Sequence, residues 1–255
     1  MKTQTQRLRF GWIPDLPDHR DHLYAASKLA MAKIPAYADL REKCPPIYNQ
    51  GNLGSCTANA IAAAFEFEQI KQEEPEFVPS RLFIYYNERA MEHTINSDSG
   101  AQIRDGIKSV NKLGVCDEKI WPYNITTFIQ KPSAACYTDA LKHTATSYHR
   151  LMNDLKHMKG CLADGYPFVF GFSVYESFMS ADVAKTGHAP MPKKTEKCEG
   201  GHAVMAVGYD DANKWFIIRN SWGTGWGMKG YFTLPYDYLT NNNLADDFWT
   251  IRLVK

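Results

Sequence analysis

The most constraining feature of the chain is an alanine-rich segment, residues 55–72, whose apolar residues fall at helical spacing (SCTANAIAAAFEFEQIKQ). Such a helix has almost no polar face, so it must be packed against the rest of the protein over most of its surface. Ser55 is a residue type that commonly caps a helix N-terminus, and we expect the helix to begin there. The 255-residue chain is 44% hydrophobic, which is enough apolar material for a sizeable core around this helix.

The other predicted elements change character along the chain. Two further helices are predicted over residues 80–93 and 103–114, with Gly114 ending the second. After about residue 130, short segments rich in β-branched and aromatic residues predict strands at 166–175, 201–211, 214–222 and 229–236. A helical first half followed by a strand-rich second half predicts an α+β fold with two lobes.

Charge and cysteine usage exclude several classes of protein. The 29 Lys and Arg residues nearly match the 28 Asp and Glu residues, so the chain lacks the basic field that binding a nucleic acid or a membrane surface requires. No run approaches the roughly 18 apolar residues of a membrane span, and the N-terminus shows no apolar core of a signal peptide. The compartment stays open, either cytoplasmic or reached by an export route that the sequence does not show. The six cysteines include no CxxC pair, so we expect no zinc site of that spacing.

A glycine-rich turn delivers Cys56 to the first turn of the alanine-rich helix (QGNLGSC, residues 50–56). Backbone N–H groups and the helix dipole stabilise an anion at that position, so we expect the pKa of the Cys56 thiol to fall towards that of a reactive thiolate. Glycines on either side of the turn allow a substrate carbonyl to approach the sulfur closely. The alternative is a small buried cysteine that packs as a hydrophobe.

Two more segments hold the remaining parts of a nucleophilic site. His202 opens a predicted strand (GGHAV), and histidine is the side chain best suited to move a proton near neutral pH. Asn220 lies in RNSWGTGWG, where it is placed to orient an imidazole while Trp222 shields their hydrogen bond from water. Taken singly, these are a core histidine and an aromatic-decorated turn. Together with Cys56 they supply the nucleophile, base and orienting group that covalent acyl transfer needs.

The combination resembles a papain-family (C1) cysteine peptidase, in which Cys, His and Asn occur in this order. Four further segments are similar to those of the family: IPAYADLR (34–41), NQG (49–51), DSGA (98–101) and WPY (121–123). The resemblance implies a papain-like fold for residues 34–255, with a helical left lobe over about 34–130 and a β-barrel-like right lobe over about 131–255. An active-site cleft between the lobes would hold Cys56 on one wall and His202 with Asn220 on the other.

The same resemblance implies roles for individual residues. Cys56 would be the thiolate nucleophile, His202 its partner and later general acid, and Asn220 the residue that orients His202. Gln50 would donate its side-chain amide to the oxyanion beside the Cys56 N–H. Substrate binding would involve Gly100, which presents backbone groups to an extended peptide, together with Ser99, Gly201 and Trp222.

Several positions depart from the family pattern. Leu53 and Ser97 stand where the family usually has two cysteines joined in a disulfide, and a paired loss indicates coordinated removal of that bridge. Thr57 replaces an aromatic residue, and Ser99 replaces a glycine of the substrate loop. Gly201 stands where many relatives carry Asp or Asn, so we expect a different pH profile or subsite. With Cys56 in the site, five cysteines remain, and at least one of them must be free unless it pairs between chains.

We therefore predict a cysteine peptidase that cleaves peptide bonds through an acyl-enzyme, without metal or organic cofactor. Its expected partner is a peptide or protein substrate, and it is expected to act as a monomer, away from nucleic acid and membrane. Two alternatives stay open. In the first, the same triad catalyses another acyl transfer, such as deamidation or transglutamination. In the second, the chain has a papain-like shape but no catalytic activity and acts as a binding module.

The first 33 residues have no helical periodicity and are too short for the usual papain-family propeptide domain. We expect an extension, with the charged residues between positions 15 and 22 solvated at the surface. One hypothesis is that residues 1–33 lie along the cleft and restrain activity, anchored by the apolar segment FGWIP at 10–14. The competing expectation is an arm that docks elsewhere or stays disordered.

Overall fold

The computed structural model describes residues 9–24 and 33–255. In chain order its elements are β1 (Tyr37–Asp39), η1 (Arg41–Lys43), α2 (Cys56–Gln72), α3 (Arg81–Met91), α4 (Ile103–Lys112), η2 (Ile125–Thr127), α5 (Ala134–Ala140), β2 (Ala145–Arg150), α6 (Leu155–Ala163), β3 (Phe168–Tyr175), α7 (Ala181–Thr186), β4 (Cys198–Asp210), β5 (Trp215–Arg219), β6 (Tyr231–Pro235), α8 (Tyr236–Leu239) and β7 (Ala245–Val254).

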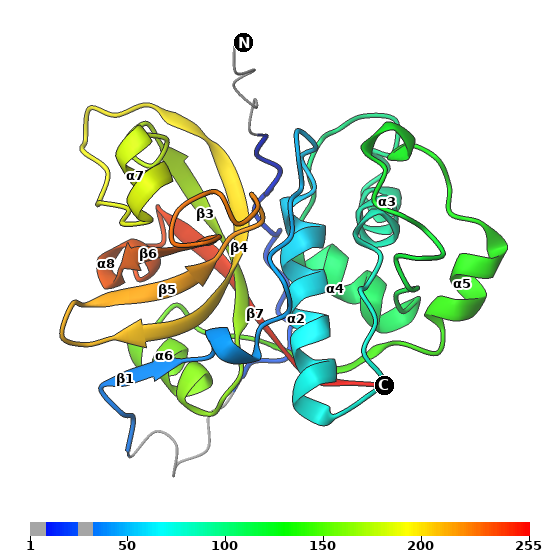
Figure 1. Cartoon of the computed structure of the whole chain (residues 1–255), viewed down its shortest axis with the longest axis horizontal. Coiled ribbons are helices and arrows are strands. Elements are labelled where there is room, and N and C mark those ends of the chain that lie inside the picture. The colour runs from blue at the N-terminus through cyan, green and yellow to red at the C-terminus, as the bar shows by residue number, and fades with distance from the viewer. Residues whose placement is uncertain (1–8, 25–32) are drawn as a thin grey trace.

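Two lobes lie side by side, one built on helices α2–α5 and the other on the sheet (Figure 1). Helix α2 lies at the boundary and packs on strands β4 and β7 of the sheet lobe as well as on α3 and α4. Every residue from Cys56 to Gln69 is buried, as the alanine-rich pattern predicts. Small side chains let the backbones of neighbouring elements approach this helix closely, which is what places the start of α2 between the lobes.

The helix start differs from the predicted cap. Ser55 precedes α2, but its side chain makes no hydrogen bond to the helix backbone. Its hydroxyl lies 2.5 Å from the Tyr123 hydroxyl, and Asn59 Nδ2 donates to it at 3.1 Å. Ser55 therefore ties the start of α2 to the WPY segment instead of capping the helix.

The sheet has the order β2-β7-β3-β4-β5-β6, with β1 paired to β4, and each of these pairings is antiparallel. Strand β4 is central, because it pairs with β1, β3 and β5 and carries His202. The sheet is open rather than a closed barrel, so the α+β two-lobe fold is as predicted while the barrel-like description is not.

The lobes interleave along the chain instead of dividing near residue 130. Strand β1 follows residue 34 directly yet pairs with β4, with Tyr37 opposite Asp210. Helix α5 lies beyond residue 130 but packs on the helical lobe, where the Tyr137 ring lies 4.9 Å from that of Phe83. The reason is burial. Cys136 and Ala140 of α5 are fully buried, so this face of the short helix must pack against other residues of the helical lobe.

The described N-terminal residues, 9–24, do not form a free extension. This segment, which we call the arm, runs between the two lobes (Figure 1). It pairs in parallel with one lobe at Trp12–Ala101 and with the other at Leu23–Arg150, and Tyr24 is buried. Residues 1–8 and 25–32 of the predicted extension lie outside the described residues, whereas Lys33 is described.

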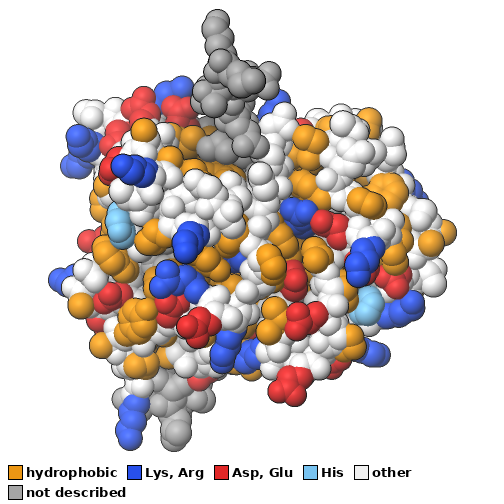
Figure 2. All heavy atoms as spheres, viewed as in Figure 1, with side chains coloured by type: hydrophobic (Ala, Val, Ile, Leu, Met, Phe, Trp, Pro, Cys, Tyr) orange, Lys and Arg blue, Asp and Glu red, His pale blue; other side chains and the backbone are white. Residues whose placement is uncertain are grey.

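The surface and the helices agree with the balanced composition. Figure 2 shows acidic, basic and apolar side chains interspersed over the face in view, without a large patch of one charge. Among the helices of residues 9–24 and 33–255, none is long and apolar enough to cross a membrane.

Candidate active site

Cys56 is the first residue of α2 and is fully buried where the helix meets the sheet lobe. The backbone N–H groups of Ala203 and Gly11 lie near its sulfur and act to lower the pKa of the thiol. Ala203 follows His202 on β4, so the sulfur and the imidazole belong to one site although they lie in different lobes. The Gly11 N–H comes from the arm.

His202 and Asn220 are joined by a hydrogen bond of 2.9 Å between Nε2 and Oδ1. The Ser221 N–H donates to the same Asn220 oxygen at 2.8 Å, which fixes the side-chain amide with its oxygen towards the imidazole. An acceptor at that position requires a proton on Nε2, so Nδ1 is the nitrogen free to accept one. Within the described part of the chain, Nδ1 is buried and has no hydrogen-bond partner.

Aromatic rings enclose this pair. Trp222 stacks on the imidazole with ring centroids 4.7 Å apart and an interplanar angle of 21°, and Phe172 contacts the ring edge-on at 5.8 Å. Both rings are buried, so the hydrogen bond between His202 and Asn220 is held away from water. This is the shielding that the sequence predicts for Trp222.

Gln50 is buried beside the nucleophile, and both ends of its amide are engaged. Its Oε1 accepts a hydrogen bond of 2.6 Å from the Ser221 hydroxyl, which fixes Nε2 as the donor on the other side of the amide. Nε2 donates to the Leu53 carbonyl at 2.9 Å and to the Arg9 carbonyl of the arm at 3.3 Å. The Arg9 carbonyl oxygen of the arm therefore accepts a hydrogen bond from Gln50 Nε2, the donor that was predicted to stabilise the oxyanion.

Comparison with known proteins agrees with this geometry. The profile of the papain family cysteine proteases matches residues 34–248. The chain belongs to the papain family of cysteine proteases.

The relatives support the same assignment. An uncharacterized peptidase C1-like protein of Acanthamoeba polyphaga mimivirus is 46% identical over all of this chain and 90% of its own length. The crystal structure of Xylellain, a cysteine protease from Xylella fastidiosa, is 49% identical and superimposes with a TM-score of 0.90, over 99% of this chain and all of that one. Cathepsin B-like CP2 of Giardia intestinalis is 28% identical over 79% of this chain and 69% of its own length. This papain-family chain is therefore a cysteine peptidase, and the binding-module and alternative acyl-transfer readings are not favoured.

The protonation state of this papain-family site differs from the expectation. Burial raises the pKa of the Cys56 thiol to about 12 and lowers the pKa of the His202 imidazole to about 4. With the arm in place, burial therefore disfavours the charged form of both groups. The predicted fall in the thiol pKa does not occur here, because loss of water around the sulfur outweighs the helix N-terminus.

The predicted substrate edge is occupied by the arm. The Trp12 N–H donates to the Gly201 carbonyl at 2.9 Å, while Ala101 accepts from the Ile13 N–H at 3.0 Å and donates to the Gly11 carbonyl at 2.8 Å. The arm is thus an added strand between the lobes. Ala101, rather than Gly100, makes these ladder hydrogen bonds.

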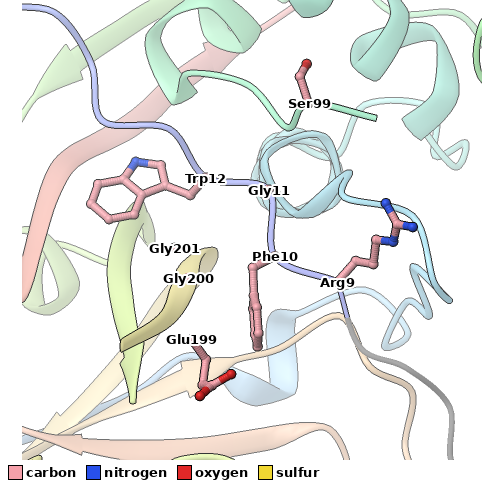
Figure 3. Close-up of a pocket in the computed structure, with 8 residues that line it drawn as sticks. All are labelled: Arg9, Phe10, Gly11, Trp12, Ser99, Glu199, Gly200 and Gly201. Atoms are coloured by element: carbon pink, nitrogen blue, oxygen red, sulfur yellow. The ribbon is translucent and has the colours of Figure 1, made fainter. Parts of the chain in front are cut away.

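Gly100 still shapes the edge. Its φ is +76°, and a Cβ there would lie 2.1 Å from the Gly11 carbonyl oxygen, so only glycine fits while the arm is docked. The Ser99 hydroxyl donates to Thr94 at 2.9 Å, and Ser99 lines a groove of about 390 Å³ above the arm (Figure 3). Trp222 lies behind His202, where it touches the arm through Phe10 at a centroid distance of 6.3 Å.

The sequence prediction missed the residues that hold the arm. Asp21 pairs with Arg104 of α4 at 2.6 Å and with Arg150 of β2 at 3.2 Å, and its side chain is only 5% exposed. Asp15 accepts from the Trp249 indole at 2.9 Å and from the Arg104 N–H at 3.1 Å. The expectation of a solvated charged cluster is therefore wrong for these two residues, which bridge the lobes. The signal in the sequence that could have indicated this bridging role was the spacing of aspartates along the arm.

The departures from the family pattern have structural counterparts. Leu53 is buried where the family has a cysteine, and all six cysteines, which lie in the described part of the chain, are free thiols. The Thr57 hydroxyl donates to the buried Glu88 carboxyl at 2.6 Å, a contact that an aromatic residue at position 57 would not make. Among residues 9–24 and 33–255, no cluster of three His, Cys, Asp or Glu side chains is arranged to hold a metal ion.

Proposed function

We propose that Cys56 attacks the peptide carbonyl as a thiolate after His202 accepts its proton, and that Asn220 holds the imidazole in the required tautomer. The hydrogen bond between His202 and Asn220 carries this assignment, since it leaves Nδ1 as the free base beside the nucleophile. Gln50 Nε2 and the Cys56 N–H would hold the oxyanion, and His202 would return the proton to the leaving amine. Water then hydrolyses the thioester. No step needs a metal or a cofactor.

We propose further that the arm keeps the enzyme latent. Its backbone occupies the two positions that catalysis requires, with the Gly11 N–H at the Cys56 sulfur and the Arg9 carbonyl on Gln50 Nε2. The group that meets the sulfur is an N–H, not a carbonyl carbon, so the arm blocks the site without being a substrate. Its position supports the hypothesis of a restraining segment over that of an arm docked elsewhere.

The substrate class follows from the chemistry of the site. We propose a peptide or protein substrate bound as an extended strand by a monomeric enzyme, supported by the paired edges at Gly201 and Ala101. A full-length Gly11→Ala chain, in which the arm is expected to leave the cleft, tests this with a peptide panel read by mass spectrometry. Peptide-bond cleavage is expected. Products that are only deamidated or joined to an added amine would contradict it.

The oxyanion role of Gln50 gives a separate prediction. In the Gly11→Ala background, Gln50→Ala is expected to lower kcat by about 100-fold with little change in KM, because the lost donor acts mainly in the transition state. Asn52→Ala is the matched control, since Asn52 is exposed on the same loop. A fall in kcat of less than about threefold for Gln50→Ala would remove Gln50 from the oxyanion site.

The arm is expected to dock more tightly in acid than in alkali. Burial raises the pKa of the Asp247 carboxyl to about 7 and also raises that of Asp15. Asp247 faces Trp12 and Asp15 of the arm, Arg150 of β2 and its neighbour Asp246. Released from the arm, exposed carboxyls return towards their ordinary pKa near 4. The docked state therefore binds protons more tightly, so docking is strongest below about pH 4 and weakens as the pH rises through about 7.

The measurement is the ratio of wild-type to Gly11→Ala turnover from about pH 5 to about pH 8. Dividing by the Gly11→Ala value removes the pH dependence of the chemistry itself. The ratio is expected to rise with pH and to flatten in Asp247→Asn, whose amide does not titrate. A ratio that falls as the pH rises would contradict this coupling.

A further inference from the structure

The two donors proposed for the oxyanion lie at opposite ends of one loop, residues 49–55, which leads into α2 and which we call the nucleophile loop. Gln50 supplies its side-chain amide near the start of this loop, and Cys56 supplies its backbone N–H directly after the loop ends. Donors stabilise a transition state most when they are already held in place before the charge develops. The contacts that fix the two ends of the loop therefore affect catalysis.

Arg81 lies behind this loop in an environment that is unfavourable for a cation. It is the first residue of α3, which packs on α2 in the helical lobe (Figure 1). Its side chain is 10% exposed and pairs with Glu118 through two hydrogen bonds, 2.8 Å from Nε to Oε2 and 2.6 Å from Nη2 to Oε1. The helix dipole opposes a positive charge in the first turn, and burying an ion pair costs desolvation. The ion pair alone therefore does not explain an arginine at this position.

The third guanidinium nitrogen, Nη1, connects the two ends of the nucleophile loop. It donates to the Asn49 carbonyl, just before Gln50, at 3.5 Å and to Asn59 Oδ1 at 3.2 Å. Asn59 lies one turn after Cys56 on α2, and its Nδ2 donates to the Ser55 carbonyl at 2.8 Å. The guanidinium is thus tied to the residue before Gln50 and, through Asn59, to the residue before Cys56.

The guanidinium also packs on two aromatic rings, one of which holds the same loop. Its central carbon lies 3.9 Å from the ring centroid of Tyr123 and 4.7 Å from that of Tyr48. The Tyr123 hydroxyl donates to the Gln50 carbonyl at 3.0 Å and lies 2.5 Å from the Ser55 hydroxyl. Tyr123 therefore contacts both ends of the loop, and stacking against Arg81 fixes the position of its ring.

We propose that Arg81 is a positioning residue that sets the spacing of the two oxyanion donors, Gln50 Nε2 and the Cys56 N–H. Its planar guanidinium offers five N–H donors in a fixed geometry, so one side chain binds a carboxylate, an amide and a backbone carbonyl together. The inference rests on the proposed peptidase function. Arg81 itself does not touch the substrate, so its effect is expected only in steps that develop an oxyanion.

The test uses full-length chains in the Gly11→Ala background. Arg81→Met and Glu118→Gln are introduced together, because a carboxylate left without its partner would destabilise the fold. With a fluorogenic peptide, kcat is expected to fall by about tenfold while KM changes less than about twofold, since misplaced donors act mainly in the transition state. Thermal unfolding gives the folded fraction of each chain, to which kcat is referred.

Two readouts distinguish positioning of the donors from a purely structural role. In the Gln50→Ala background the amide donor is already absent, so the Arg81→Met, Glu118→Gln pair is expected to lower kcat by less than about threefold. Alkylation of Cys56 by iodoacetamide forms no oxyanion, so its rate, followed by mass spectrometry, is expected to stay the same. A structural role would give the same fold loss in both backgrounds.

Two milder variants keep the inference testable if the paired substitution unfolds the chain. Arg81→Lys keeps the charge but not the planar fork, and kcat is expected to fall as in the paired variant. Tyr123→Phe keeps the ring and removes the hydroxyl that binds the Gln50 carbonyl, so kcat is expected to fall by about threefold. Its control is Tyr137→Phe, which removes a hydroxyl bound to Asn87 at 2.9 Å elsewhere in the helical lobe and is expected to leave kcat unchanged.

A second ion pair provides the control for the paired substitution. Arg41 and Asp39 lie in the sheet lobe with Nη2 and Oδ2 2.6 Å apart, the same separation as between Arg81 and Glu118. Arg41→Met with Asp39→Asn removes a pair of the same chemistry and is expected to leave kcat unchanged.

The contradicting outcomes are specific. Unchanged kcat in the paired variant, full kcat in Arg81→Lys, an equal loss with and without the Gln50 amide, or an alkylation rate that falls together with kcat would each overturn the role of Arg81 and leave the peptidase function standing. A folded Gly11→Ala chain that cleaves no peptide would overturn both.

Discussion

Cys56→Ala is expected to abolish peptide cleavage, lowering kcat by roughly a millionfold, as when an acyl-transfer enzyme loses its nucleophile. The sulfur is the only group in the proposed site that forms a bond to the substrate, so no neighbour compensates for it. His202→Ala is expected to cost nearly as much, because the nucleophile and its base act as a unit. Initial rates with a fluorogenic peptide in the Gly11→Ala background measure both.

Cys198→Ala is the matched control, because Cys198 is an exposed thiol near the start of the strand that carries His202. Its turnover is expected to be unchanged. Asn220→Ala is expected to lose less than His202→Ala, since Asn220 orients the imidazole without touching the substrate. Residual turnover in Cys56→Ala above a few per cent of the parent rate would place the nucleophile elsewhere.

Gly11→Ala is expected to raise turnover on the order of 100-fold over the wild-type chain. A Cβ on Gly11 would lie 1.8 Å from the Gly54 carbonyl oxygen, which belongs to the backbone and cannot turn aside. The arm must then leave the cleft, and the fraction of open enzyme rises from about one in a hundred towards unity. Hydrolysis of a small fluorogenic peptide at fixed pH measures the change.

Leu16→Ala provides the control for this activation, because the Leu16 side chain is 70% exposed and contributes to docking mainly through its backbone. It is expected to leave turnover at the wild-type level. A synthetic peptide of residues 9–24 with the native Gly11 is expected to restore inhibition of the Gly11→Ala chain when added in trans. Equal turnover in the wild-type and Gly11→Ala chains would show that the arm does not restrain the enzyme.

The catalytic groups were predictable because each stands in a short local pattern. Cys56 follows a glycine-rich turn at a helix start, and His202 and Asn220 lie on or next to strands with strong β-propensity. The position of α2 follows from its helical periodicity, and the positions of the four predicted strands follow from their β-branched and aromatic residues. Local patterns survive folding when the long-range packing agrees with them.

The arm and its anchors could not be predicted, because their partners are far apart in sequence. Asp15 and Asp21 appear solvated until Arg104, Arg150 and Trp249 are brought beside them. Strand β7 was missed because its second and third residues are aspartates, which disfavour strands, and the bulge at Asp247 breaks its alternation.

The pKa expectation for Cys56 failed for a related reason. The helix N-terminus that lowers the pKa of a thiol is visible in the sequence, whereas the arm that removes water from it is not. The helix N-terminus predicts a lowered pKa of the Cys56 thiol for a cleft without the arm, whereas the buried thiol beneath the arm has a raised pKa. The same contact explains why the thiol is expected to become reactive when the arm leaves.

The most direct test of a latent cysteine peptidase is labelling by an epoxide thiol trap, located by mass spectrometry, in the wild-type and Gly11→Ala chains at neutral pH. Cys56 is expected to be labelled much faster than Cys198 in Gly11→Ala and to be protected in the wild-type chain, since burial beneath the arm keeps its thiol protonated. Labelling that reaches Cys198 but not Cys56 in Gly11→Ala, or equal rates at Cys56 in both chains, would contradict the account.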